Sequence, residues 1–319
     1  MRVALGVRYL GRAYEGWQSQ LSGKTVQDKL EAALAAFAAS PVSTLCAGRT
    51  DSGVHGLMQV VHFDTEVERT PFSWVRGTNT FLPEDIAVQW AQIVPREFHC
   101  RASALSRRYL YVLSQSPVRP SVESGRVGWT MYPLDGDAMR TAAQMLVGRH
   151  DFSSFRASAC QALSPVKDVR RIDIRRDTED ERCRWYFEFE ADAFLHHMIR
   201  NIMGCLVRIG QGQARPKWMQ EVLDAKSRLI AAPTFSPAGL YFLGPQYGPE
   251  WGLPPEVTLG SGRLRIMACH EPALCPHPDQ DLRPDPRTGC GCRGGSRRRC
   301  HRLRALPQEP ALRARRAGG

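Results

Sequence analysis

Apolar residues recur along most of this chain with the spacing of either strands or helices. Runs and alternations of strand length predict strands over residues 3–9, 57–63, 86–94, 108–113, 169–175 and 184–190. Apolar residues at helical spacing predict helices over residues 25–40, 135–147, 194–209 and 216–225, with Thr25 as the N-cap of the first. Both element types occur in each half of the chain, which indicates an α+β fold.

The pattern divides the chain into two mixed halves, residues 1–105 and 106–256, joined near residues 102–106. If their sheets meet edge to edge, a central cleft opens between the halves. Clefts between domains are where ligand sites usually lie. This cleft is therefore the predicted functional region.

Residues 257–319 differ in composition from the rest. They hold 13 arginines and five acidic residues, so this tail carries +8 of the net charge of +11. The high isoelectric point is thus weak evidence that the two halves bind nucleic acid. Proline, glycine and arginine without a hydrophobic period predict disorder in the tail. Its cysteines and histidines lack the paired spacing of structural zinc sites, so no metal site is predicted there.

Composition narrows the class of protein. No apolar stretch is long enough to predict a membrane span. The first nine residues carry charge where a signal peptide would be apolar, and they are predicted to form a strand instead. Most of the ten cysteines are isolated within predicted elements, which favours reduced thiols and a cytoplasmic location over a disulfide framework.

Residues 48–56 contain the strongest candidate for catalysis. Asp51 stands two positions after Arg49 and two before Gly53. An arginine this close can keep a carboxylate ionised in a partly dry site, and glycines allow backbone to approach a ligand. The alternative is that Asp51 only stabilises its own turn, which is the usual role of Asp beside Gly.

Other polar and aromatic residues stand where packing alone does not require them. Arg200 lies within an apolar helix pattern and needs a carboxylate partner such as Asp51, unless it points to solvent. Tyr109 follows two arginines on a predicted strand and could stack on an RNA base, whereas Tyr111 on the same face is expected in the core. The adjacent His196 and His197 should face different ways and are interpreted as packing residues.

Nine stretches of the chain resemble, in order, the motifs of the tRNA pseudouridine synthase A (TruA) family, over roughly residues 3–248. Leu10 and Cys100 depart from the family's usual Asp and Ala, and the tail has no counterpart in the family. The matching stretches are residues 14–18, 48–56, 59–63, 79–86, 98–101, 108–111, 150–156, 194–201 and 239–241.

The resemblance implies two ferredoxin-like halves with a shared sheet, in a homodimer. It implies an isomerase that converts uridine to pseudouridine at positions 38, 39 and 40 of the tRNA anticodon stem-loop, without metal or cofactor. Asp51 matches the catalytic aspartate and Arg200 its basic partner. Tyr109 matches the tyrosine that stacks on the uracil, Leu240 the apolar residue on the other side of the base, and Arg49 the arginine associated with flipping the nucleotide.

The reaction explains these residue types. Uracil must leave the sugar at N1, turn, and rejoin through C5. A carboxylate can attack the anomeric carbon, attack the base, or remove a sugar proton, and the sequence leaves these routes open. Two other functions also stay open: a non-catalytic RNA-binding protein of the same fold, and a hydrolase that pairs Asp51 with Asp85 or Asp151.

Overall fold

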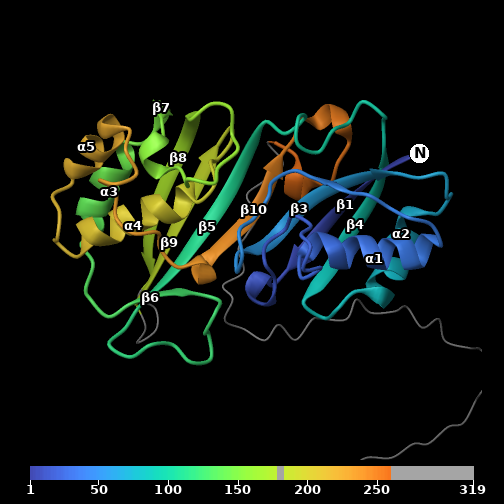
Figure 1. The fold of residues 1–319 in the computed structure, drawn as a ribbon, viewed down its shortest axis with the longest axis horizontal. Coiled ribbons are helices and arrows are strands. Elements are labelled where there is room, and N and C mark those ends of the chain that lie inside the picture. Colours follow the sequence, from blue (N-terminus) through green and yellow to red (C-terminus); the bar gives the residue numbers. More distant parts are fainter. Residues whose placement is uncertain (178–182, 260–319) are drawn as a thin grey trace, which may run out of the picture. The chain divides into compact units, whose positions relative to one another are not determined.

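The computed structural model describes residues 1–177 and 183–259 (Figure 1). The tail from residue 260, with all its cysteines and histidines, lies outside the described residues. Three of the five described cysteines, Cys46, Cys100 and Cys205, are buried free thiols. Within the described ranges no helix is long and apolar enough to cross a membrane.

One mixed sheet runs through the described chain, in the order β4-β1-β3-β10-β5-β9-β8-β7. The short strands β2 and β6 pair with β3 and β5. The strands are β1 Arg2–Tyr9, β2 Leu45–Cys46, β3 His55–Asp64, β4 Ile86–Val94, β5 Ser106–Gln115, β6 Gly128–Thr130, β7 Gly148–Asp151, β8 Val166–Asp177, β9 Cys183–Ala191 and β10 Leu240–Gln246.

In the part of the chain that the structure describes, five α-helices accompany this sheet, and the expected α+β class is confirmed. The four predicted helices are present, and α2 is an addition that the apolar pattern did not reveal. The helices are α1 Val26–Ala38, α2 Pro71–Phe81, α3 Gly136–Gln144, α4 Met198–Gly210 and α5 Trp218–Ala225. Single 3-10 turns lie at Gly11–Ala13, Ser153–Phe155, Pro237–Gly239, Pro249–Trp251 and Pro255–Val257.

Strand β10 joins the two sets of strands that the sequence predicted. It pairs in parallel with β3, where Tyr241 lies opposite His55, and antiparallel with β5, where Phe242 lies opposite Tyr109 (Figure 1). The late segment 240–246 therefore lies at the centre of the sheet. The sheets do meet edge to edge as expected, but through a strand that the sequence pattern did not identify.

Helix boundaries follow from capping side chains. The Thr25 side chain accepts a hydrogen bond from the Asp28 N–H, which confirms the predicted cap of α1. Asp135 caps α3 in the same way, through the N–H groups of residues 137 and 138. Helix α4 begins at Met198 rather than near residue 194, because His197 has a left-handed backbone with φ 62°. The predicted start of this helix was wrong by one turn.

The core consists of clusters on both faces of the sheet. On β1, Val3 and Leu5 pack with α1 residues such as Leu30, whereas Ala4 belongs to a separate cluster. This alternation is the period of two expected for a strand buried on both faces. The separate cluster includes Val257, which is fully buried, so the folded part continues past residue 256.

Candidate active site

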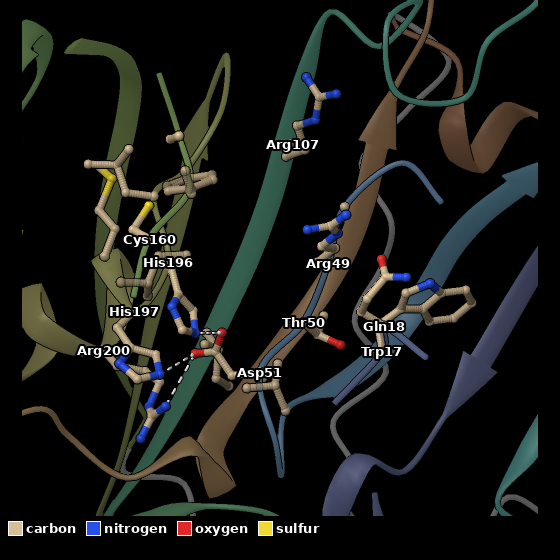
Figure 2. A pocket seen from close by; sticks show the side chains of 18 of the residues that line it. Trp17, Gln18, Arg49, Thr50, Asp51, Arg107, Cys160, His196, His197 and Arg200 are labelled. Atoms are coloured by element: carbon tan, nitrogen blue, oxygen red, sulfur yellow. Dashed lines mark hydrogen bonds and ion pairs between the residues drawn. The ribbon is translucent and has the colours of Figure 1, made fainter. Parts of the chain in front are cut away.

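A cleft of about 860 Å³ lies where the two sets of strands meet (Figure 2). One wall is the loop over residues 47–52, which precedes β3. The opposite wall is the segment over residues 193–200, which connects β9 to the start of α4. Tyr109 of β5 and Leu240 of β10 also line it. The central cleft expected from the sequence is therefore present.

Asp51 opens a tight turn in the first of these walls. Its carbonyl oxygen accepts a hydrogen bond from the Val54 N–H at 3.1 Å, and Gly53 between them has φ +79°. That positive φ is what the third position of a type II turn requires, which explains the glycine. The turn is thus closed by the backbone, so the Asp51 side chain is available for other contacts.

A second glycine positions the same loop. Gly16 has φ +99°, and a Cβ built on it would lie 2.8 Å from the Thr50 carbonyl oxygen. That carbonyl accepts a hydrogen bond from the Trp17 N–H at 3.0 Å. The backbone of the 14–18 stretch therefore supports the residue directly before Asp51.

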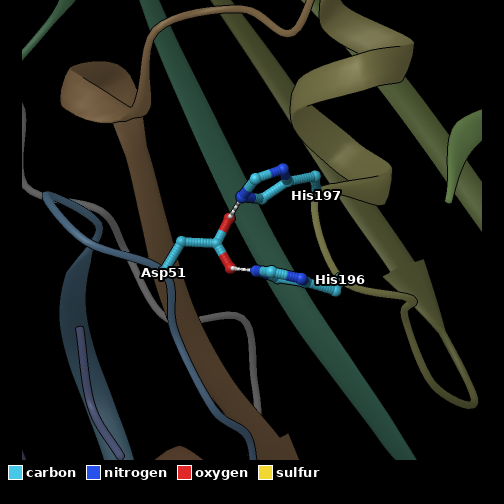
Figure 3. A group of neighbouring side chains, drawn as sticks. All are labelled: Asp51, His196 and His197. Atoms are coloured by element: carbon cyan, nitrogen blue, oxygen red, sulfur yellow. Dashed lines mark ion pairs between the residues drawn. The ribbon is translucent and has the colours of Figure 1, made fainter. Parts of the chain in front are cut away.

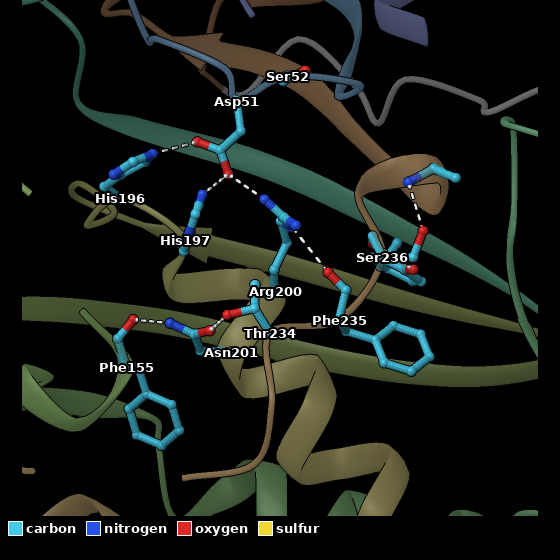
Figure 4. A network of polar contacts seen from close by, with 12 residues as sticks. Asp51, Ser52, Phe155, His196, His197, Arg200, Asn201, Thr234, Phe235 and Ser236 are labelled. Carbon is cyan, nitrogen blue, oxygen red and sulfur yellow. Dashed lines mark hydrogen bonds and ion pairs between the residues drawn. The ribbon is translucent and has the colours of Figure 1, made fainter. Parts of the chain in front are cut away.

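The Asp51 carboxylate contacts three basic side chains from the opposite wall (Figure 4). Arg200 Nη1 lies 3.2 Å from Oδ2, and His197 Nε2 lies 3.5 Å from the same oxygen. His196 Nε2 lies 3.3 Å from Oδ1. The predicted pairing of Asp51 with Arg200 is therefore present. Arg200 does not point to solvent, and the Asp51 side chain does more than stabilise its own turn.

Arg200 is held in place by its surroundings. Its Nε donates to the Phe235 carbonyl oxygen at 2.9 Å, and only 14% of its side chain is exposed. The neighbouring Asn201 donates to the Phe155 carbonyl at 2.8 Å and accepts from Thr234 Oγ1 at 2.7 Å (Figure 4). These bonds fix the first turn of α4, so the guanidinium meets Asp51 in one orientation.

The interpretation of His196 and His197 as packing residues was wrong. Adjacent side chains diverge along a regular helix, but residue 197 is left-handed and precedes α4. Both rings therefore point to Asp51. Burial lowers the pKa of His197 below its ordinary value, although the charge of Asp51 opposes this. The N-terminal end of the helix that follows carries a partial positive charge, which favours an anion near it.

Tyr109 and Leu240 are among the apolar residues that line the cleft. The Tyr109 ring packs against Phe242, with centroids 4.9 Å apart, and against Phe194 at 5.1 Å. Burial raises the pKa of the Tyr109 hydroxyl well above its ordinary value, and the nearby Asp51 adds to the rise, so the phenol stays protonated. Tyr111 lies in the core, as predicted, and donates to the Ser236 carbonyl at 2.8 Å.

Arg49 lines the cleft but does not hold the carboxylate. Among the described residues, the ion pairs of Asp51 are with Arg200 and the two histidines, so the expectation drawn from the closeness of Arg49 in sequence was wrong. The Arg49 side chain is exposed at the cleft instead. Proximity in sequence is a poor guide here because the loop turns the two side chains apart (Figure 2).

Two further arginines line the cleft: Arg107, one of the two arginines that precede Tyr109, and Arg101, which the sequence analysis did not single out. Arg107 donates to the Asp192 carbonyl at 2.7 Å, and burial lowers its pKa. Arg101 is exposed and donates to the Cys46 carbonyl at 3.3 Å. The signal for Arg101 was its place in the 98–101 stretch that resembles a family motif.

The carboxylates considered for a hydrolase lie elsewhere. Asp85 accepts a hydrogen bond from the Tyr14 hydroxyl at 2.5 Å, and Asp151 accepts one from the Ser153 N–H at 2.9 Å. Neither lines the cleft. Glu15 does, but it accepts a hydrogen bond from Ser22 Oγ at 2.7 Å. The geometry therefore gives no support to a paired-carboxylate mechanism with either predicted acid.

Comparison with known proteins now identifies the family. The model of the tRNA pseudouridine synthase family matches residues 6–101 and 142–248. The chain belongs to the tRNA pseudouridine synthase family. It is 78% identical over 262 residues to tRNA pseudouridine synthase A of Variovorax paradoxus (strain S110), covering 82% of this chain and 97% of that protein. The family and the isomerase class expected from the sequence are confirmed.

Other members of this pseudouridine synthase family are similar over the same part of the chain. The tRNA pseudouridine synthase A of Delftia acidovorans (strain DSM 14801 / SPH-1) is 68% identical, covering 80% of this chain and 96% of that protein. The protein of the same name from Paracidovorax citrulli (strain AAC00-1) is 69% identical, with 81% and 98% coverage.

Proposed function

We propose that this isomerase converts uridine to pseudouridine at positions 38, 39 and 40 of the tRNA anticodon stem-loop, with Asp51 as its catalytic carboxylate. The observation that carries the proposal is the position of Asp51, at the centre of the cleft and in contact with Arg200 from the opposite wall. Attraction between these opposite charges holds the carboxylate in a fixed position within the cleft, where each chemical route needs it.

The reaction breaks one glycosidic bond and forms another. The bond from C1′ of the ribose to N1 of uracil breaks, the base turns within the cleft, and C5 bonds to C1′. The proton on C5 is then lost and N1 gains one, so the product is an isomer of the substrate. Asp51 acts either as the nucleophile or as the base that starts this sequence.

The free uracil must be held while it turns. Tyr109 and Leu240 line the cleft beside Asp51 and provide apolar walls for the base. A protonated Tyr109 hydroxyl can also donate a hydrogen bond to it. Extruding the nucleotide from its stack costs a few kcal/mol, and the exposed guanidinium of Arg49 is placed to offset this cost through the RNA backbone.

The protein is further proposed to act as a homodimer in the cytoplasm, without metal or cofactor. The family resemblance supports the dimer, and the buried free thiols of the described chain suit a reducing compartment. Light scattering of the purified protein measures the dimer directly. A monomeric mass at working concentration would contradict it.

The decisive experiment uses tRNA transcripts with a single uridine at position 38, 39 or 40. Purified full-length protein is compared with Asp51→Asn, which keeps the side-chain shape and removes the charge, and pseudouridine is mapped after each incubation in chelated buffer. We expect wild type to modify each position, and Asp51→Asn to bind tRNA but lose at least about a thousandfold in rate.

The matched control is Asp137→Asn, on the exposed face of α3, where 92% of the side chain is accessible. It should retain the wild-type rate. Release of free uracil would contradict the isomerase in favour of a hydrolase. Pseudouridine formed by Asp51→Asn would contradict the role of Asp51. Binding of tRNA by wild type without any product would favour the non-catalytic alternative.

A further inference from the structure

Asp51, His196 and His197 bring together three side-chain atoms of the kind that bind metal ions. A carboxylate oxygen of Asp51 and one ring nitrogen each of His196 and His197 all lie within 4.8 Å of one another (Figure 3). Their convergence depends on the left-handed backbone of His197, because a helical residue there would direct the two rings apart. Nitrogen and oxygen donors of this kind suit Zn²⁺ and similar transition-metal cations.

The distances agree with such a site. Donors that bind zinc at about 2.1 Å in a tetrahedral arrangement lie about 3.4 Å from one another. The imidazole–carboxylate distances at Asp51 are 3.3 Å from His196 to Oδ1 and 3.5 Å from His197 to Oδ2, so a cation on Oδ1 requires a small shift of the His197 ring. The side chains of His196 and His197 are 40% and 30% exposed, so they have room for small adjustments and the cation has access from solvent.

Arg200 weakens cation binding at Asp51 but does not block it. Its guanidinium contacts Oδ2 of Asp51, whereas Oδ1 faces His196 alone among the described ion pairs. A cation bound through Oδ1 leaves the Arg200 contact intact. The positive guanidinium lowers the attraction of the site for a cation, so binding is expected to be reversible and moderate in strength.

We propose that Asp51, His196 and His197 form an inhibitory binding site for Zn²⁺ in the cleft. The cation occupies the carboxylate that the reaction needs and the space that the uracil would enter. Zinc therefore competes with the tRNA substrate rather than assisting it. The inhibitory effect rests on the proposed role of Asp51, whereas the binding of the cation does not.

Calorimetric titration of metal-free full-length protein with ZnCl₂ tests the binding. We expect His196→Gln and His197→Asn each to lose one equivalent of zinc, or to bind it at least tenfold more weakly than wild type. Cysteine thiolates are zinc ligands as well, and the chain has ten cysteines, so Co²⁺ spectra of the same proteins separate thiolate sites from nitrogen–oxygen sites. The control is His150→Gln, whose ring contacts the Val147 carbonyl outside the cleft, and it should bind as wild type does.

Activity provides the second measurement. Pseudouridine formation by wild type should fall as ZnCl₂ is added and recover when chelator is added. For each protein, we measure the zinc concentration that halves its own zinc-free rate. This concentration should be at least tenfold higher for His196→Gln than for wild type.

Equal zinc binding by wild type and both cleft variants would overturn the proposal, as would bound zinc that leaves the rate unchanged. Failure of wild type to form pseudouridine in chelated buffer would instead contradict the proposed function, and the titration would still decide the metal site.

Discussion

At the scale of single residues, the role of each side chain in the site depends on which groups it contacts. Asp51 is one of 32 acidic residues, and it differs from the others in meeting Arg200, His196 and His197 at once. Tyr109 differs from Tyr111, two positions on, because one lines the cleft and the other is in the core. Residue type alone does not distinguish these roles.

The Tyr109 hydroxyl gives a prediction at this scale. Tyr109→Phe keeps the ring contacts with Phe194 and Phe242. The equilibrium constant of unfolding and the Kd for tRNA should therefore each change by less than about twofold. Turnover should fall by about tenfold or more if the protonated hydroxyl donates to the turning base. Single-turnover rates and tRNA binding, measured side by side, check this. Equal turnover of the two proteins would exclude a role for the hydroxyl.

At the scale of elements, several functional groups lie at boundaries, whereas Tyr109 lies within β5 and Arg200 in the first turn of α4. Asp51 precedes β3, His196 and His197 precede α4, and Leu240 is the first residue of β10. Interiors of elements are determined by their periodic apolar faces. Boundaries are determined by caps, positive φ angles and close backbone approaches, which allow irregular side-chain directions.

The Gly16 contact gives a prediction at the element scale. Gly16→Ala places a methyl group against the Thr50 carbonyl and should displace the Asp51 turn. We expect the rate of pseudouridine formation to fall at least about tenfold, with a loss of stability of more than ~1 kcal/mol. Enzyme kinetics and urea unfolding measure the two effects.

Gly23→Ala is the matched control for this variant. Gly23 also has a positive φ, +63°, but an added Cβ meets nothing within 4 Å. The control should therefore lose stability through backbone strain alone and keep the wild-type rate. Equal rates of pseudouridine formation in the two variants would show that the close contact of Gly16 with the Thr50 carbonyl does not position Asp51.

At the scale of the whole molecule, β10 determines where the site forms. It pairs with β3 on one edge and β5 on the other, so it brings the Asp51 loop and Tyr109 together. The Asp51–Arg200 contact spans 149 positions in the chain. Every cleft contact therefore depends on the completed sheet, and loss of global stability should abolish the site as a unit.

Acid stability gives a prediction at this scale. Burial and the charge of Arg2 lower the pKa of His62 to about 4, and its Nδ1 accepts the Cys100 N–H. As the pH falls below about 6.5, the unfolded chain binds a proton at this histidine before the folded protein does. Between pH 7.5 and 5, the free energy of unfolding should therefore decrease, with His62 contributing about 1–2 kcal/mol of the loss.

Urea unfolding at the two pH values measures this contribution. His62→Asn keeps an acceptor for the Cys100 N–H but cannot titrate, so it should lose less stability on acidification than wild type. His150→Gln, altered at a histidine of β7, serves as the control and should keep most of the wild-type loss. If wild type and His62→Asn lost the same free energy of unfolding between pH 7.5 and 5, the loss could not be assigned to His62.

The sequence predicted much of the fold because its signals are local. Thr25 caps α1 through a residue three positions away, and the apolar stripe of that helix repeats within one turn. The strands next to it alternate over a few residues. The segment 240–246 gave no comparable signal, because a strand buried on both sides lacks alternation and this one is short.

The sequence by itself determined the amphipathic elements, the caps, the family motifs and the presence of an acidic residue in a glycine-bounded turn. Only the tertiary structure decided which cation meets that acid, namely Arg200 rather than Arg49, and that two adjacent histidines converge on it. The reason is the range of the interactions. Hydrogen bonds within a turn connect residues a few positions apart, whereas the electrostatics of the cleft depend on groups that the sheet brings together from distant parts of the chain.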